Sequence, residues 1–219
     1  MNKYKLLIIL CFFFLTTFLP NVKAWINDYS LIGKVICLDS GHGGIDTGAK
    51  NSTIIEKDLN LILTKKLERE LTSRGATVYL TREGDYDLSK TTIGRKRNDL
   101  YNRAKYINKI NPDMYISVHL NATSSPKWRG LQIFYTEKNS QNKIIADSLT
   151  NYLKDNMSYV RNIKKDSTYY MYKYINSPGV LIEAGFISNL DDNYLLRNSD
   201  YQDKLVSLIS NGIEKYFEK

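Results

Sequence analysis

Short apolar segments alternate with amphipathic helical segments along most of this 219-residue chain, and this alternation constrains its fold more than any other feature. The segments with the length and apolar character of buried strands are residues 34–39, 76–81, 113–118, 130–135 and 179–183. Apolar residues at helical spacing predict helices over residues 56–74, 98–108, 140–156 and about 205–217. The pattern predicts an α/β fold: a single domain in which a central, mostly parallel twisted sheet is flanked by helices.

The first 24 residues have the composition of an export signal. Lys3 and Lys5 precede an apolar run, Pro20 ends that run, and small residues precede a cleavage site after Ala24. The run is short for a bilayer span of about 20 residues. We therefore predict that residues 1–24 are a signal peptide and that residues 25–219 form one domain, exported across the cytoplasmic membrane to the cell-wall side. The alternative is an uncleaved leader, which would tether the protein to the membrane through residues 1–24.

The charge and the cysteine content exclude some classes of protein. The chain has 31 Lys and Arg against 23 Asp and Glu, a formal net charge of +8. This moderate excess suits an anionic wall or membrane surface, but there is no dense basic block, and with an export signal we expect no nucleic acid partner. Cys37 is the only cysteine beyond the leader, so the exported domain cannot form an intramolecular disulfide. Its apolar surroundings predict a small core residue.

The two histidines of the chain lie at the ends of predicted strands. His42 follows the strand at 34–39 in a glycine-rich loop, and His119 directly follows the strand at 113–118. The carboxyl ends of parallel strands meet at one edge of a sheet, where ligands bind in folds of this kind. One histidine there is more often a hydrogen-bonded structural residue, whereas two make a metal site or an acid–base site an equal alternative.

Two glutamates occupy comparable places. Glu56 opens the helix at 56–74, and Glu183 ends the strand at 179–183. Each has an ordinary structural explanation, because the helix dipole stabilises a first-turn glutamate and a strand-end carboxylate can form a salt bridge. Together, however, the histidines and glutamates supply what hydrolytic zinc needs: two His and one Glu ligand, an open position for water, and a further carboxylate for proton transfer.

Five short motifs accompany these residues: DSGHGG at 39–44, EKD at 56–58, LTR at 80–82, SVHLNA at 117–122 and EAGFISN at 183–189. In order and spacing they resemble the zinc N-acetylmuramoyl-L-alanine amidases, whose fold is exopeptidase-like, and the resemblance extends from about residue 34 to residue 217. A single motif is weak evidence, but the combination is specific. Further stretches look like the spore-cortex amidases of endospore-forming bacteria, the CwlD type: RKR at 95–97, DLYNR at 99–103, SPKWRG at 125–130 and YQDK at 201–204.

The resemblance implies a role for each candidate residue. His42, Glu56 and His119 would be the ligands of one Zn²⁺ ion, and Glu183 would be the catalytic carboxylate, acting as general base and then as general acid. Zinc would lower the pKa of its bound water, so no serine or cysteine nucleophile is required. Asp39 would lie outside the ligand set and orient His42 or its loop, and a loop-capping aspartate is the equal alternative.

The same resemblance implies the reaction and its setting. The bond cut would be the amide between N-acetylmuramic acid and L-alanine in peptidoglycan. In the spore-cortex subgroup this removes stem peptides as a step toward the muramic-δ-lactam that germination requires, so the substrate would be spore-cortex peptidoglycan. Because we see no wall-binding repeat in the chain, we also expect an accessory protein partner that positions or activates the enzyme.

Three other functions fit the sequence less well. A zinc carboxypeptidase would have a compact His-x-x-Glu ligand pair, whereas Glu56 is far beyond that spacing from His42. Polysaccharide deacetylases have their motifs in another order. A non-catalytic peptidoglycan-binding module would lack one of the four site residues, and all four are present.

One position departs from the family pattern. Ser40 stands where the family usually has proline after the aspartate. Because proline fixes φ, serine is expected to loosen the loop that carries His42 and so to weaken zinc binding. The alternative is that the Ser40 hydroxyl caps the loop, which would leave zinc binding unaffected.

Overall fold

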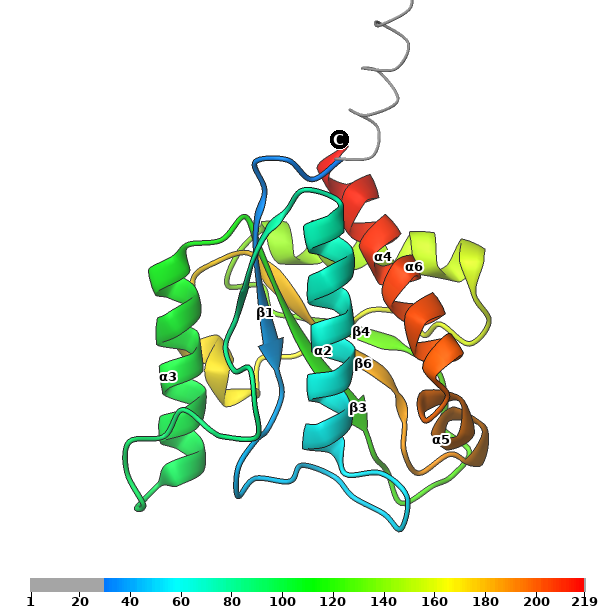
Figure 1. The fold of residues 1–219 in the computed structure, drawn as a ribbon, viewed down its shortest axis with the longest axis horizontal. Coiled ribbons are helices and arrows are strands. Elements are labelled where there is room, and N and C mark those ends of the chain that lie inside the picture. Colours follow the sequence, from blue (N-terminus) through cyan, green and yellow to red (C-terminus); the bar gives the residue numbers. More distant parts are fainter. Residues whose placement is uncertain (1–29, 219) are drawn as a thin grey trace, which may run out of the picture.

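The structure is a computed structural model that describes residues 30–218, and its centre is a six-stranded sheet (Figure 1). The strands lie in the order β2-β1-β3-β6-β4-β5. Their bounds are β1 Val35–Ser40, β2 Thr77–Leu80, β3 Met114–Asn121, β4 Gln132–Tyr135, β5 Lys164–Lys165 and β6 Gly179–Phe186. All neighbouring pairs are parallel except β4 and β6, which are antiparallel. The predicted α/β fold with a mostly parallel sheet is confirmed.

Three long helices build the larger core on one face of the sheet: α2 (Glu56–Ser73), α4 (Gln141–Asn156) and α6 (Ser199–Phe217). The leucines that predicted α2 all point inward and are buried: Leu59, Leu63, Leu67 and Leu71. α6 packs against both α2 and α4, so the three helices form one continuous layer.

A smaller core lies on the other face, beneath α3 (Arg95–Ile110) and the short 3-10 helix η1 (Tyr170–Lys173). Cys37 of β1 is fully buried in it, as predicted. Burial, with the nearby charge of Asp39, raises the pKa of the Cys37 thiol far above its ordinary value, so the thiol stays protonated.

Both central strands are longer than predicted. β3 continues to Asn121, so His119 lies within the strand instead of after it. β6 continues to Phe186, beyond Glu183. The two strands pair with each other over this extra length, and these mutual hydrogen bonds hold polar residues in strand conformation where the apolar pattern has already ended.

The sequence did not predict three short elements, which are β5, η1 and α5 (Leu190–Leu196). Each is too short to show a hydrophobic period. α5 does have a readable start, because the Asn189 side chain accepts hydrogen bonds from the backbone N–H groups of Asp191 and Asp192.

The two ends of α2 mark opposite edges of the domain (Figure 1). Glu56 begins the helix at the edge where the parallel strands end. At the other end, the Arg74 carbonyl accepts a 2.9 Å hydrogen bond from the backbone N–H of Leu31, where the described chain joins the domain. No helix within residues 30–218 is long and apolar enough to cross a membrane. The predicted leader, residues 1–24, lies outside the described residues.

Candidate metal centre

His42 is held in an unusual backbone conformation just after β1. Its φ is 63°, in the left-handed region that non-glycine residues rarely adopt. The Nη2 group of Arg103 donates a 2.5 Å hydrogen bond to the His42 carbonyl, and the Gly41 N–H donates to the Val118 carbonyl of β3. The loop is therefore fastened to the sheet on both sides of the histidine.

Glu56 begins α2 and turns its carboxylate back toward the sheet. Oε2 accepts a 2.7 Å hydrogen bond from the Ala49 N–H, and Oε1 accepts one of 3.2 Å from the Leu120 N–H. Gly48, with φ of 63°, lies against this carboxylate, and a Cβ there would come within 2.5 Å of Glu56 Oε2 and 2.6 Å of the His42 ring. Glycine is required at this position because any side chain would displace both groups.

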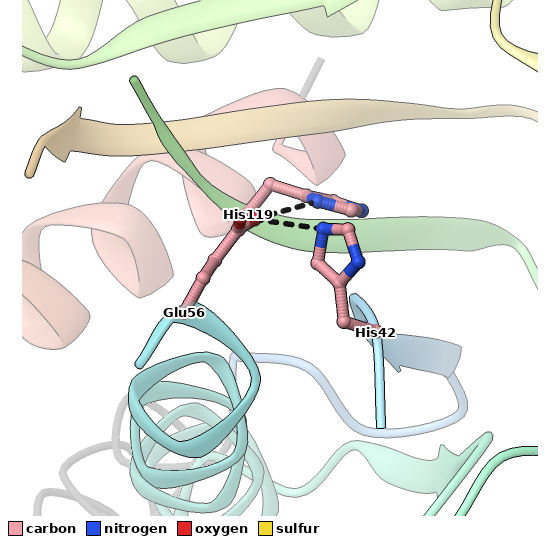
Figure 2. Close-up of side chains that lie close together, drawn as sticks. All are labelled: His42, Glu56 and His119. Carbon is pink, nitrogen blue, oxygen red and sulfur yellow. Dashed lines mark hydrogen bonds and ion pairs between the residues drawn. The ribbon is translucent and has the colours of Figure 1, made fainter. Parts of the chain in front are cut away.

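His42, Glu56 and His119 converge from three elements: the loop after β1, the start of α2, and β3 (Figure 2). Glu56 Oε1 lies 3.1 Å from His42 Nε2 and 3.1 Å from His119 Nδ1. One donor atom from each residue fits within a span of 4.8 Å. Gly41 allows this approach, since a Cβ at Gly41 would lie 2.3 Å from the His119 ring. The sequence-predicted ligand residues are thus brought together.

Each histidine has its other ring nitrogen near an orienting group that sequence reasoning missed. His42 Nδ1 lies 2.9 Å from Asp46 Oδ2. His119 Nε2 lies 3.4 Å from the Tyr169 hydroxyl, and the two rings meet edge to face. Asp46 follows His42 by four residues, a spacing that could have signalled a contact. Tyr169 comes from a distant loop and gave no such signal.

The charges within the site stabilise one another. Burial alone would raise the pKa of Glu56, but hydrogen bonds from His119 and His42 outweigh it and lower that pKa far below its usual range. For His42, burial lowers the pKa, and the carboxylates of Glu56 and Asp46 overcome this and raise it. The buried Glu56 carboxylate, which lies between the two imidazoles, is negatively charged, so the site favours a positive charge.

Asp39 does not touch either histidine ring. It is fully buried, and its carboxylate accepts hydrogen bonds from Thr81, Ser117 and Arg103. Burial would raise the pKa of Asp39, but the Arg103 charge and these hydroxyls lower it. Arg103 also donates to the His42 carbonyl, so its guanidinium links the Asp39 carboxylate to the histidine loop.

Two buried arginines clamp the backbone of the histidine loop, and sequence reasoning assigned neither a role. Arg82 Nε donates to the Ser40 carbonyl at 2.9 Å, and its Nη2 donates to the Gly41 carbonyl at 3.1 Å. Arg103 Nη1 donates to the same Ser40 carbonyl at 2.6 Å. The Ser40 hydroxyl itself is buried and has no hydrogen-bond partner within residues 30–218. The alternative that this hydroxyl caps the loop is therefore wrong.

Glu183 lies beside His119, as its register partner across β3 and β6. Its Oε2 atom is buried and has no hydrogen-bond partner in the described part of the chain. Burial, with the nearby negative charge of Glu56, raises the pKa of Glu183 to about 8. A carboxyl group that is neither a predicted ligand nor neutralised by a partner is suited to moving protons.

These residues open into a cavity of about 540 Å³. His42, His119 and Glu183 line one part of it, while the remainder is formed by residues of α3, β4, β6 and the segment 166–170. A cavity of this size is ample for a disaccharide or a short peptide.

Comparison with known proteins agrees with this architecture. Residues 36–215 match the Amidase_3 family, described as N-acetylmuramoyl-L-alanine amidase. The germination-specific N-acetylmuramoyl-L-alanine amidase of Bacillus subtilis is 41% identical over 217 residues, which cover 96% of this chain and 91% of that protein.

Two solved structures of amidases also match this chain. The CwlD amidase from Clostridioides difficile, whose structure was solved in complex with the GerS lipoprotein, has a TM-score of 0.78 and 38% identity, covering 85% of this chain and 99% of that one. The catalytic domain of CwlV, an amidase of Bacillus (Paenibacillus) polymyxa var. colistinus, has a TM-score of 0.73 and 27% identity, covering 84% and 98%. The chain therefore belongs to the N-acetylmuramoyl-L-alanine amidase family, as its motifs predicted, and is a peptidoglycan amidase.

Proposed function

We propose that this amidase depends on one Zn²⁺ ion held by His42, Glu56 and His119. The convergence of these three donors is the observation that carries the proposal. Two imidazole nitrogens and one carboxylate oxygen are a donor set that catalytic zinc sites use. The 3.1 Å distances from Glu56 Oε1 to the two histidine nitrogens also suit this metal, since ligands about 2.0–2.2 Å from a tetrahedral ion lie roughly 3.4 Å apart.

Glu183 is the catalytic carboxylate in this proposal. Zinc, when bound, lowers the pKa of a water molecule and polarises the scissile carbonyl. Glu183 takes a proton from the attacking water and passes it to the nitrogen of L-alanine as that amine departs. A pKa raised to about 8 in the metal-free protein suits both steps, because the group neither holds its proton permanently nor loses it permanently near neutral pH.

Asp46 and Tyr169 orient the ligand rings. Asp46 accepts the Nδ1 proton of His42, which leaves Nε2 as the nitrogen that faces Glu56. Burial raises the pKa of Tyr169 well above its ordinary value, so its hydroxyl stays neutral beside His119. Asp39 and Arg103 fix the backbone of the histidine loop, because Arg103 pairs with Asp39 and donates to the His42 carbonyl.

The biological substrate in this proposal is spore-cortex peptidoglycan, from which the enzyme removes stem peptides on the way to muramic-δ-lactam. The germination-specific name of the Bacillus subtilis relative supports this. We further propose that residues 1–24 export the protein, that residues 25–219 are the catalytic domain, and that the enzyme works on the wall side of the membrane. The GerS complex of the Clostridioides difficile enzyme supports a lipoprotein as accessory partner.

The test begins with the purified protein and spore-cortex peptidoglycan. Mass spectrometry should show free stem peptides and glycan strands that retain an intact lactyl group, and elemental analysis should give about one zinc per chain. His42→Ala and His119→Ala should lose tight zinc binding and activity together. If the His42→Ala/His119→Ala double variant retained a full equivalent of zinc, the proposed site would be wrong.

A further inference from the structure

The face of the sheet that carries Glu183 continues beyond the catalytic centre. Glu183 pairs with His119, and Phe186 pairs with Asn121, across a register shift that inserts one extra residue into β6. His119 and Asn121 point to the same side of β3, so the shift returns Phe186 to the side of Glu183. On the other flank, Gln132 of β4 is the register partner of Glu183.

Arg161 lies over this extension and is held in place by three groups. Its guanidinium stacks 4.5 Å from the centre of the Trp128 ring and 5.6 Å from that of Phe186. Its Nε donates a 3.3 Å hydrogen bond to Gln132 Oε1. Gln132 is itself fixed, because its Nε2 donates to the Asn162 carbonyl at 3.0 Å. The guanidinium is thus preorganised next to the strand pair that carries the catalytic carboxylate.

Among the described residues, no carboxylate pairs with the charge of Arg161. Arg129, which precedes β4, contacts Asp191 and Asp192, and Arg103 contacts Asp39 and Asp99. Within residues 30–218, by contrast, the Nη groups of Arg161 form no hydrogen bond and no ion pair. A planar guanidinium with free N–H donors matches the geometry of a carboxylate, which it can bind through two parallel hydrogen bonds.

We propose that Arg161, stacked on the exposed ring of Trp128, binds a free carboxylate of the stem peptide. The proposal rests on the amidase function proposed above. The lactyl carboxyl of N-acetylmuramic acid is consumed in the scissile amide, so the glycan side is neutral there. The stem peptide carries the free α-carboxylate of its second residue, D-glutamate, one residue beyond the scissile bond.

This placement fixes the direction in which the substrate lies. The peptide extends from Glu183 across Gln132, out of the cavity, toward Arg161 and Trp128, and the glycan lies within the cavity, against α3. The enzyme is then selective for stem peptides whose second residue keeps its carboxylate, and it discriminates against those in which this group is a primary amide.

The test compares two muramoyl tetrapeptides that differ only in this carboxylate or amide. Wild-type enzyme should have a kcat/KM for the carboxylate form that is about tenfold higher or more. Arg161→Gln should lose this preference by raising KM for the carboxylate form alone, with kcat little changed. Arg161→Lys should keep part of it, since it retains the charge and loses the planar fork. Arg69→Gln removes an equal charge from the exposed face of α2 and is the matched control.

A binding measurement gives a second readout that needs no turnover. The chain has two tryptophans, so a Trp25→Phe/Glu183→Gln background leaves Trp128 as the only one. The carboxylate tetrapeptide should change Trp128 fluorescence at roughly tenfold lower concentration than the amide form, and Arg161→Gln should abolish the difference.

Two results would overturn the assignment: an undiminished preference in Arg161→Gln, or equal losses on both substrates, which would make the stack structural. Unchanged kinetics in Arg161→Gln and Trp128→Ala, with loss of binding to a partner protein, would instead identify a protein interface. If wild-type enzyme cleaved neither tetrapeptide, the proposed function would fail, and the fluorescence titration would still decide the role of Arg161.

Discussion

His119 and Glu183 lie directly opposite each other in the parallel pair β3 and β6. The pairing of these two strands therefore sets the distance between the proposed metal ligand and the proposed proton-transfer group, and neither residue lies on a loop. Their separation follows from the distance between hydrogen-bonded strands, which varies little among proteins. This relationship leads to predictions that separate ligand from catalyst.

Glu183→Gln should keep the fold and the zinc but lose turnover, because proton transfer typically contributes 10²–10⁴-fold. Glu56→Gln should instead weaken zinc retention, since it removes a ligand charge that two imidazoles contact. Zinc content and kcat measured on both variants check the assignment. Exchanged phenotypes would mean that the two roles are reversed.

Glu183 should make the stability of the metal-free protein depend on pH. Its folded-state pKa of about 8 exceeds the ordinary value of 4.5, so the folded state holds the proton more tightly than the unfolded state. The stability from this proton is present below pH 4.5 and is lost as the pH rises through 8. With chelator present, Glu183→Gln should therefore melt at the wild-type temperature near about pH 5 and above it near about pH 8. Equal melting temperatures at both pH values would contradict the burial argument.

Asp46→Ala should weaken zinc binding by about 10–100-fold, the usual effect of removing a group that orients a ligand histidine. The reason is its 2.9 Å contact with His42 Nδ1, which selects the tautomer and the ring position. Chelator competition measures the affinity. Asp58→Ala, an exposed first-turn aspartate of α2, is the matched control and should bind zinc as wild type does.

Arg103→Leu should destabilise the protein by about 3–5 kcal/mol, because it leaves the buried carboxylates of Asp39 and Asp99 without their positively charged partner. Urea denaturation gives this free energy. Arg103→Leu/Asp39→Asn removes both charges, so its loss should be clearly smaller than that of Arg103→Leu alone plus Asp39→Asn alone. Additive losses would show that the two side chains act independently.

Ser40 distinguishes two accounts of the histidine loop. The sequence-based hypothesis of a loosened loop expects Ser40→Pro to tighten zinc binding about fivefold and to raise the melting temperature of the metal-free protein. The hydrogen bonds from Arg82 and Arg103 to the Ser40 carbonyl already restrain the loop, so we expect a change of less than fivefold. Ser40→Ala should not destabilise the protein, since its hydroxyl has no partner. Chelator competition and thermal melts decide between these accounts.

The elements with long hydrophobic periods could be predicted from the sequence, and so could the residues that meet at the sheet edge. His42, Glu56 and His119 were found because histidines are scarce and strand ends converge in a parallel sheet. The sequence did not show which residues hold the backbone of the histidine loop in place. Arg103 lies in the predicted helix 98–108 and Arg82 directly follows the predicted strand 76–81. Their buried contacts depend on how β2 and α3 pack against the loop after β1.

The contacts that residues 159–175 make with the site also could not be predicted from the sequence. The segment contains only the two-residue β5 and the four-residue η1, so it shows no long hydrophobic period, and the contact between Tyr169 and His119 is set by tertiary packing. Arg161 is a similar case, since its stacking partner Trp128 comes from a different loop. Contacts between irregular segments are set by tertiary packing, which leaves no local pattern.

The catalytic edge and the start of the described chain lie at opposite ends of α2, and this fixes how far the catalytic edge can lie from a membrane anchor. The 18 residues of α2, at a rise of about 1.5 Å each, separate Glu56 from the point where the described chain joins the domain by roughly 27 Å. If residues 1–24 stay in the membrane, the catalytic edge is the end of the domain away from the tether, and the five residues 25–29 can add at most about 17 Å. A tethered enzyme would then cut only peptidoglycan within roughly 30–45 Å of the bilayer. A cleaved enzyme would have no such limit, so the depth of cortex that is processed would report whether the leader is removed.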